Sequence, residues 1–336
     1  MTDPAGTVLV AAVEGTSLSA AELSFFRREQ PSGVTLFRRN VPPNHREVRA
    51  LVAELQATRS SSAPPLVIAI DQEGGRVARL TAPFPNPGPA MQLAAGRVDE
   101  DAIRVVTDAG SACGRELASL GINVNFAPVL DVLTEPTNTA IGDRAFGTDQ
   151  ETVIARASAW LSGLQATGVF GCLKHFPGQG DAKVDTHEGT AVIDLPREVL
   201  DRRELVPFRA LAGRAPMIMV AHCIYPQLSP LEATRSPQII GQLLRGELRY
   251  EGVVVSDDLN MGALPQDGKE WQSALVQVVA AGCDMLLVCR HLERCQSGVE
   301  ALRREAARSR AFAERLEAAA TRVLKMRGRL LPVMPA

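Results

Sequence analysis

One stretch of the chain decides the fold prediction: residues 152–175, TVIARASAWLSGLQATGVFGCLKH. Its first part, residues 152–167, has the apolar spacing of a helix. A short and almost continuous apolar run follows at 169–175, and it ends in Lys174 and His175. Such a run is typical of a parallel strand that is covered on both faces. The stretch therefore predicts a helix followed by a buried strand with polar residues at its carboxyl end.

The same alternation extends over the whole chain. Eight short apolar runs occur, at residues 7–13, 33–37, 66–71, 123–132, 169–175, 217–222, 253–257 and 284–289. Helical periodicity is found between them at 19–29, 44–59, 99–120, 152–167, 197–212, 238–248 and 270–281, and a terminal helix is expected at about 302–327. Eight strands that alternate with helices favour an α/β fold of the (β/α)8 TIM-barrel type.

A doubly wound open sheet is the alternative fold. Its dinucleotide-binding and P-loop versions would require GxGxxG after the first strand or GxxxxGK[ST], and the sequence contains neither. No cofactor is therefore expected. No linker-like change in composition divides the chain, so we expect one catalytic barrel domain over residues 1–336.

Composition restricts the class of protein further. The chain has 36 Lys and Arg against 38 Asp and Glu, a net charge of −2, whereas nucleic-acid-binding proteins normally have a basic excess. The longest uninterrupted apolar run, residues 8–13, is far shorter than the roughly 20 residues that span a bilayer. No basic segment precedes it, as it would in a signal peptide. We therefore expect a cytoplasmic protein that binds neither nucleic acid nor membrane.

The six cysteines form no CxxC pair. Disulfides are rare in cytosolic proteins, and four of these cysteines lie in or beside apolar runs. The pattern favours reduced core cysteines over a disulfide framework or a metal cluster.

Polar residues gather where the apolar runs end. In a barrel the active site is formed at the carboxyl ends of the strands. Asp71, Asp131, His222 and Asp257 end or directly follow such runs, as do Lys174 and His175. A charged residue at the end of a buried strand is costly without a partner. The sequence thus predicts one surface that holds carboxylates, imidazoles and cations, although a core role for His222 is equally compatible with its position.

Five of these polar segments resemble the motifs of glycoside hydrolase family 3, and they occur along the chain in the same order as in that family. KHFPGQGD at 174–181, followed by DTH at 185–187, is similar to the KHFPGHGD…DSH signature of that family. The other four are DQEGGRV at 71–77, GDRAFG at 142–147, AHCIY at 221–225 and SDDLNM at 256–261. The resemblance covers about residues 8–330, and the absence of a second α/β domain is typical of the single-domain, NagZ-type β-N-acetylglucosaminidase branch.

The resemblance implies a retaining exo-hydrolase that removes terminal β-linked N-acetylglucosamine. In that branch the expected substrate is the small disaccharide GlcNAc-1,6-anhydro-MurNAc, with or without its peptide, during peptidoglycan recycling. By family position Asp257 is the nucleophile, and His187 supported by Asp185 is the acid/base. The residues at the family's sugar-binding positions are Asp71, Arg79, Arg144, Lys174 and His175. Gln179 stands where the motif usually has His, which affects the geometry or pH profile of the loop but not the reaction class.

Four alternative functions stay open at this point. A neutral imidazole as acid/base repels phosphate less than a carboxylate does, so a β-glycoside phosphorylase is one alternative. A β-glucosidase or xylosidase of the same family is another. A metal-dependent hydrolase would need closely spaced imidazole ligands, and the first strand ends in Val13-Glu14-Gly15 without an HxH. A non-catalytic barrel that only binds glycans is disfavoured because Asp185, His187 and Asp257 are all present.

Overall fold

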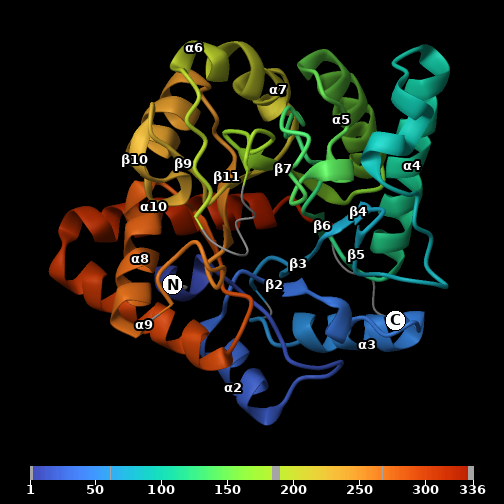
Figure 1. Cartoon of the computed structure of the whole chain (residues 1–336). Helices are drawn as coiled ribbons and strands as arrows, with labels where there is room; N and C mark the ends of the chain where they lie inside the picture. The colour runs from blue at the N-terminus through green and yellow to red at the C-terminus, as the bar shows by residue number, and fades with distance from the viewer. Residues whose placement is uncertain (1–2, 61, 184–189, 267, 332–336) are drawn as a thin grey trace.

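The chain folds into a closed barrel of eight parallel strands surrounded by helices (Figure 1). A computed structural model describes residues 3–60, 62–183, 190–266 and 268–331. The strands follow one another around the barrel in chain order, and the last pairs with the first. They are β1 (Leu9–Ala11), β2 (Gly33–Leu36), β3 (Val67–Ile70), β6 (Val124–Asn125), β7 (Phe170–Phe176), β8 (Met217–Val220), β11 (Val253–Asp258) and β12 (Met285–Leu287). The closure confirms the predicted (β/α)8 barrel and excludes the open sheet.

The fourth strand is much shorter than predicted. We expected it over residues 123–132, but β6 ends at Asn125. Pro128 has no N–H and cannot donate to the ladder. Beyond it the chain meets β7 again, where Val129 bridges Lys174 and the Leu130 N–H donates to the Lys174 carbonyl oxygen (2.6 Å). The apolar run is therefore an extended segment that proline interrupts.

Side chains alternate between the two sides of the barrel wall, as they do in any strand. On β11, Val253 and Val255 belong to the apolar cluster inside the barrel, whereas Val254 belongs to the cluster between the strands and the helices. The strands are thus apolar on both faces, which is why they read as continuous apolar runs. All six cysteines are free and buried, which confirms the prediction of core thiols.

The seven helices predicted between the strands form within three residues of their expected ends. Ser19 and Asp99 act as helix caps, accepting hydrogen bonds from the N–H groups of Glu22 (3.2 Å) and Ala102 (2.9 Å). The segment 197–211 is helical throughout, with a π-helical middle. Apart from 3₁₀ helices, the helices up to the last strand are α1 (Pro4–Thr7), α2 (Ala20–Glu29), α3 (His45–Gln56), α4 (Glu100–Ser119), α5 (Gln150–Gln165), α6 (Arg197–Val199), η4 (Leu200–Glu204), α7 (Leu205–Leu211), η7 (Gln238–Glu247) and α8 (Gly268–Ala281).

Two neighbouring outer helices, α4 and α5, approach closely because glycines lie in their contact (Figure 1). A Cβ atom on Gly110 of α4 would lie 2.3 Å from the carbonyl oxygen of Trp160 in α5. A Cβ on Gly163 of α5 would lie 2.1 Å from the carbonyl oxygen of Thr107 in α4. Any larger residue would force the two helices apart.

The terminal helix expected at 302–327 is instead two helices, α9 (Leu292–Arg308) and α10 (Arg310–Arg327). They meet at Ser309, whose backbone is extended (φ −131°, ψ 112°) and whose hydroxyl accepts from the Phe312 N–H (3.2 Å). The prediction was wrong because it did not take this serine as a cap. Val323 and Met326 of α10 join the cluster inside the barrel, so α10 closes its amino-terminal end.

A buried carboxylate fixes this closed end. Asp284 directly precedes β12 and is fully buried. Its carboxylate pairs with Arg315 (2.9 Å) and Arg322 (3.2 Å) of α10 and with Arg245 of η7. It also accepts the N–H of Val254 (3.0 Å), at the start of β11. One side chain thus ties two outer helices to two barrel strands.

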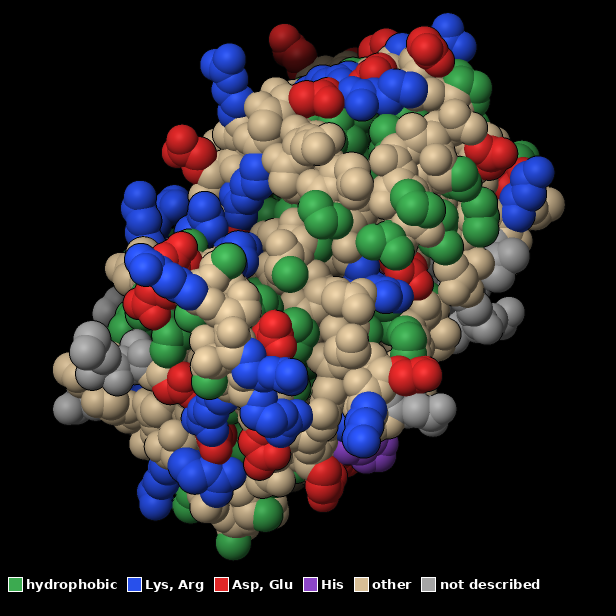
Figure 2. All heavy atoms as spheres, turned by 90° about the vertical axis from the view of Figure 1, so that its left-hand side faces the viewer, with side chains coloured by type: hydrophobic (Ala, Val, Ile, Leu, Met, Phe, Trp, Pro, Cys, Tyr) green, Lys and Arg blue, Asp and Glu red, His purple; other side chains and the backbone are tan. Residues whose placement is uncertain are grey.

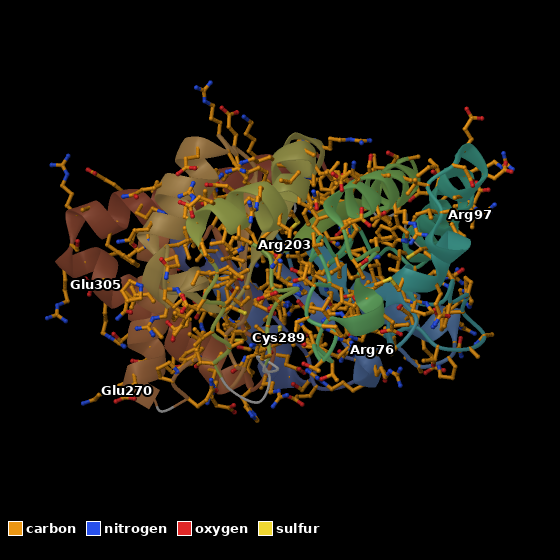
Figure 3. All side chains as sticks on the ribbon, turned by 45° about the horizontal axis from the view of Figure 1, so that its top comes forward. Arg76, Arg97, Arg203, Glu270, Cys289 and Glu305 are labelled. Atoms are coloured by element: carbon orange, nitrogen blue, oxygen red, sulfur yellow. The ribbon has the colours of Figure 1, made fainter. Side chains whose placement is uncertain are left out.

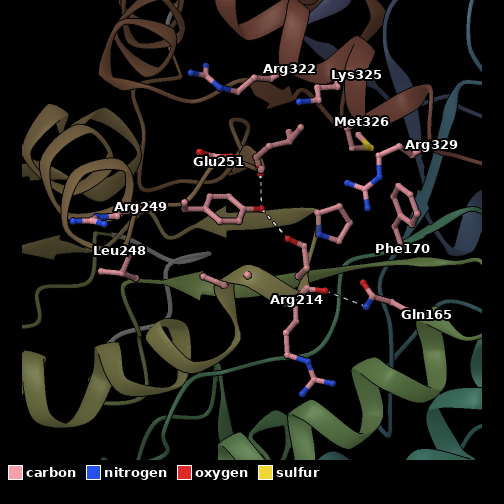
Figure 4. A pocket seen from close by; sticks show the side chains of 17 residues that line it. Gln165, Phe170, Arg214, Leu248, Arg249, Glu251, Arg322, Lys325, Met326 and Arg329 are labelled. Carbon is pink, nitrogen blue, oxygen red and sulfur yellow. Dashed lines mark hydrogen bonds between the residues drawn. The ribbon is translucent and has the colours of Figure 1, made fainter.

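A hollow of about 590 Å³ lies at the same end of the barrel. Phe170, Pro216 and Gly252, which line it, stand at the starts of β7, β8 and β11. Figure 4 shows the side chains that line it from α10, Arg322, Lys325 and Met326, and that of Arg329 just after α10. This hollow is therefore at the opposite end from the carboxyl ends of the strands.

The surface is mixed in charge. On the face shown in Figure 2, Lys and Arg side chains lie among Asp and Glu side chains. Among the described helices, none is both long enough and apolar enough to cross a bilayer.

We predict that Asp284→Ala lowers the free energy of unfolding by about 3 kcal/mol, because three arginines lose the carboxylate that they share. Chemical denaturation followed by circular dichroism measures this change. The matched control is Arg310→Ala on α10, which removes only an exposed pair with Glu314 and is expected to cost less than about 0.5 kcal/mol. Equal effects of the two variants would contradict the anchoring role of Asp284.

Candidate active site

The polar residues that end the strands lie together at the carboxyl end of the barrel. β3 leads into a hairpin of β4 (Gln72–Gly74) and β5 (Val77–Ala78), which carries Glu73 and is followed by Arg79. β7 contributes Lys174 and His175, and β11 contributes Asp257. In Figure 3, Arg76 in the hairpin turn and Cys289 just after β12 lie on the same side of the molecule. The barrel thus places segments that are distant in sequence around one site.

Lys174 is at the centre of the site. Its side chain is 2% exposed, and its Nζ lies 2.8 Å from Asp71 Oδ1 and 2.6 Å from Glu73 Oε1. Burial opposes protonation of Lys174, but Asp71 and Glu73 outweigh it and raise its pKa above the usual range. An ammonium has three donors, and two of them are used by these carboxylates.

Two arginines complete the network around these carboxylates. Arg144 donates to Glu73 through both Nε and Nη2, each at 2.8 Å, and Arg79 Nη2 lies 3.2 Å from Asp71 Oδ2. Burial favours the neutral acid at Asp71 and Glu73. The neighbouring cations nevertheless hold the pKa of both carboxyls below its usual range. The site is therefore a set of ionised groups that hold one another in place before any ligand binds.

His175 is held in one tautomer by Asp131. The fully buried Asp131 accepts from His175 Nδ1 (2.7 Å) and from the backbone N–H groups of His175 (3.3 Å) and Gln179 (2.8 Å). On the other side of the ring, Nε2 faces Arg144 Nη2 at 3.4 Å. An arginine can only donate, so in the neutral ring Nε2 is the acceptor and Nδ1 carries the proton.

Asp257 lies near these groups at the end of β11. Its Oδ1 accepts the N–H of Asp258 at 2.8 Å. Burial favours the neutral acid, but His222 and His175 oppose it, with help from that N–H and from Lys174. The pKa of Asp257 is consequently below its usual range, and the carboxylate is ionised at neutral pH.

His222 is a buried histidine with partners on both ring nitrogens. Its Nδ1 is 2.8 Å from Thr234 Oγ1, and its Nε2 donates to the carbonyl oxygen of Asp258 (3.1 Å). The core role that the sequence left open is confirmed. The ring also supports the strand end next to Asp257.

Two of the predicted catalytic residues, Asp185 and His187, lie outside the described residues. The segment before them is described, and it includes Gln179, the departure from the family motif. Gln179 is buried, and its Oε1 accepts from the Cys223 thiol (3.4 Å). Its side-chain oxygen is therefore used in buried packing against Cys223.

Sequence reasoning placed Asp131 on the polar surface without giving it a role and did not single out Glu73, although each connects site residues that it did name. Glu73 joins Lys174 to Arg144, and Asp131 orients His175. A signal was present in both cases, because Glu73 lies inside a quoted motif and Asp131 ends an apolar run. Among the described residues, no group of three or more His, Cys, Asp or Glu is placed to hold a metal ion.

Comparison with known proteins agrees with this arrangement. Residues 9–326 match the model of the glycosyl hydrolase family 3 N-terminal domain. A β-hexosaminidase from Alkalilimnicola ehrlichii is 41% identical over 293 residues, which are 85% of this chain and 81% of that protein. A family 3 β-N-acetylglucosaminidase from Paenibacillus superposes with a TM-score of 0.91 at 36% identity, over 98% of this chain and 62% of that longer one.

A third similar structure is NagZ from Neisseria gonorrhoeae in complex with N-trifluoroacetyl-D-glucosamine. It has a TM-score of 0.79 at 27% identity and covers 94% of this chain and 98% of its own. The family model spans nearly all of the barrel, including every strand that contributes to the site. The chain therefore belongs to glycoside hydrolase family 3 and is a glycoside hydrolase.

Proposed function

We propose that the chain is a retaining exo-β-N-acetylglucosaminidase that acts on GlcNAc-1,6-anhydro-MurNAc and its peptides during peptidoglycan recycling in the cytoplasm. The observation that carries the proposal is an ionised Asp257 next to a preformed set of charged groups in a family 3 barrel. The relative from Alkalilimnicola ehrlichii is named a β-hexosaminidase. The similar NagZ structure holds an N-acylated glucosamine derivative.

In this proposal Asp71, Arg79, Arg144, Lys174 and His175 bind the terminal sugar. Each sugar hydroxyl can both donate and accept, and the site offers both kinds of partner. Lys174 has a third donor beyond Asp71 and Glu73, and the Asp71 carboxylate has lone pairs beyond those used by Lys174 and Arg79. Because these groups already hold one another, little ordering is required when the sugar binds.

The reaction proceeds in two steps. A carboxylate oxygen of Asp257 attacks the anomeric carbon while the bond to the leaving oxygen breaks, and His187 gives its proton to that oxygen. Water then attacks the anomeric carbon and gives a proton back to His187, and the ester to Asp257 breaks. Asp185 supports the imidazole in both steps. Two displacements return the sugar with its original β configuration.

The product of the reaction tests this function. Incubation with GlcNAc-1,6-anhydro-MurNAc is expected to release free N-acetylglucosamine, which appears first as the β anomer in a proton NMR time course. Appearance of the α anomer first would contradict a retaining mechanism. Formation of N-acetylglucosamine 1-phosphate in phosphate buffer would identify a phosphorylase instead. Turnover of aryl β-glucosides or xylosides alone would identify a β-glucosidase or xylosidase of the same family.

Replacement of the proposed nucleophile gives a second test. Asp257→Ala is expected to lower kcat on an aryl β-N-acetylglucosaminide by on the order of 10⁴-fold, since the covalent route is lost. Asp108→Ala, at an exposed position on α4, is the matched control and should retain full activity. Mass spectrometry after trapping with a slow fluorinated sugar should locate the label on the peptide that contains Asp257. A label on another peptide would refute the assignment.

Asp131 allows a test of how His175 is positioned. Asp131→Asn replaces one acceptor oxygen by a donor, although three N–H groups point at this carboxylate. We expect kcat/KM to fall by about 100-fold because the His175 ring is displaced. Asp108→Asn is the control for the same chemical change at the surface. Unchanged kinetics in the Asp131 variant would show that His175 does not depend on it.

A further inference from the structure

The hollow at the amino-terminal end of the barrel, opposite the candidate active site, has a cationic lining. We propose that it is a binding site for a small molecule that carries a phosphoryl group. Within the described residues, the lining contains five cations and one carboxylate, Glu251. The chain as a whole has a net charge of −2, so the excess of positive charge is local to this hollow. Its cations are Arg214, Arg249, Arg322, Lys325 and Arg329.

These cations come from three separate segments of the chain. Arg322, Lys325 and Arg329 are spaced by three and four residues, which places them on one face of α10 and its continuation. Arg214 ends η5 (Ala212–Arg214) before β8, and Arg249 lies between η7 and β11. Figure 4 shows the α10 side chains along one side of the hollow and Arg214 on the opposite side. Basic residues at the end of α10 complement its dipole, but the dipole does not account for cations from the other two segments.

Asp284 does not neutralise this end of the barrel. Its carboxylate pairs with Arg322 (3.2 Å), but it also pairs with Arg245 and with Arg315. One negative charge is thus shared among three guanidinium groups. Burial holds the pKa of Arg245 below its usual range; Asp284 opposes this shift, whereas Arg322 and Arg315 add to it. The arginines therefore repel one another, and an anion in the hollow would reduce that repulsion.

The other four cations of the hollow form no ion pair with a carboxylate of the described part of the chain. Arg214 Nη2 donates to the hydroxyl of Ser162 in α5 (2.7 Å), which is a neutral partner. The Arg329 guanidinium lies over the ring of Phe170, 5.5 Å from its centroid. A guanidinium on a neutral hydroxyl or an aromatic face keeps its full charge. These side chains are consequently available to an anionic ligand.

Arg249 occupies a backbone position that favours glycine. It follows the carboxyl end of η7 with a φ of 51°, and the next N–H, that of Tyr250, donates to the carbonyl oxygen of Leu244 (3.1 Å). Glycine is the usual residue where a helix ends in this way, because the left-handed conformation is costly for a residue with a Cβ. Such strained residues are concentrated at functional sites. The arginine at this position therefore supports a binding role for the lining.

The size and charge of the hollow favour a phosphoryl group over a single carboxylate. Its volume of about 590 Å³ lies within the range of small-molecule sites, roughly 300–1,000 Å³. A phosphoryl group carries about 1.5 to 2 negative charges at pH 7 and three acceptor oxygens, and arginine matches its geometry with two parallel donors. A carboxylate has one charge and would leave most of the cations unpaired. Phe170, Pro216 and Met326 offer apolar surface to the rest of the ligand.

Calorimetric titration tests the proposal and distinguishes free phosphate from a phosphate ester. The purified chain is titrated with orthophosphate and with adenosine 5′-monophosphate at low ionic strength, and adenosine is the uncharged control. We expect a Kd below about 1 mM for at least one of the two anions and no binding of adenosine. Tighter binding of the nucleotide would identify an ester as the ligand. Equal or tighter binding of orthophosphate would identify free phosphate.

Two variants locate the site, since the candidate active site also contains cations. Arg249→Gly removes a cation and relieves the left-handed backbone, so it should weaken binding by about tenfold without lowering the Tm. Lys325→Gln should weaken binding to a similar extent. The matched control is Arg310→Gln, an exposed position on the same helix as Lys325, which should leave the Kd unchanged. The proposal is overturned if neither anion binds with a Kd below about 1 mM, or if either hollow variant binds as tightly as the wild-type chain.

Discussion

The site depends on one interaction, the buried ammonium of Lys174 between the carboxylates of Asp71 and Glu73. Burying any of these charges alone would cost several kcal/mol, so each requires the others. The pairing brings the hairpin after β3 against β7, and Arg144 adds the loop after β6 through Glu73. The groups that are proposed to hold the sugar are therefore positioned by the same contacts that allow them to be buried.

The two ends of the barrel use ion pairs for different purposes. At the closed end, Asp284 is surrounded by three arginines and one backbone N–H, so its acceptors are largely occupied. At the open end, Lys174 and Asp71 keep donors and lone pairs beyond their mutual contacts. A buried ion pair that stabilises the fold has its hydrogen-bonding groups fully used, whereas a site that binds a polar ligand needs charged groups with unused donors and acceptors. The Asp284 cluster lies at the amino ends of the strands, whereas the Lys174 cluster lies at their carboxyl ends, where the active site of such a barrel is formed.

The sequence predicted the barrel and most of the residues at its open end, because both depend on local patterns. Apolar runs locate the strands, and a charge at the end of such a run is conspicuous. The prediction failed where a single residue changes the pattern, at Pro128 and Ser309. It also gave no role to Glu73 or Asp131, because their importance lies in contacts with residues far along the chain. Glu73 contacts Arg144 and Lys174, and Asp131 contacts His175. Nothing in local spacing shows such contacts, although the charges themselves were visible.

Gln179 and His175 donate to the same carboxylate, that of Asp131. The backbone N–H of Gln179 donates to Asp131, which already accepts two hydrogen bonds from His175. The side chain of Gln179 meets the Cys223 thiol in a buried setting, where a neutral amide needs no counter-ion. A protonated histidine there would bring a charge into this buried packing, which is costly without a partner. A neutral residue at position 179 thus suits this buried setting, and the departure from the family motif is compatible with the proposed chemistry.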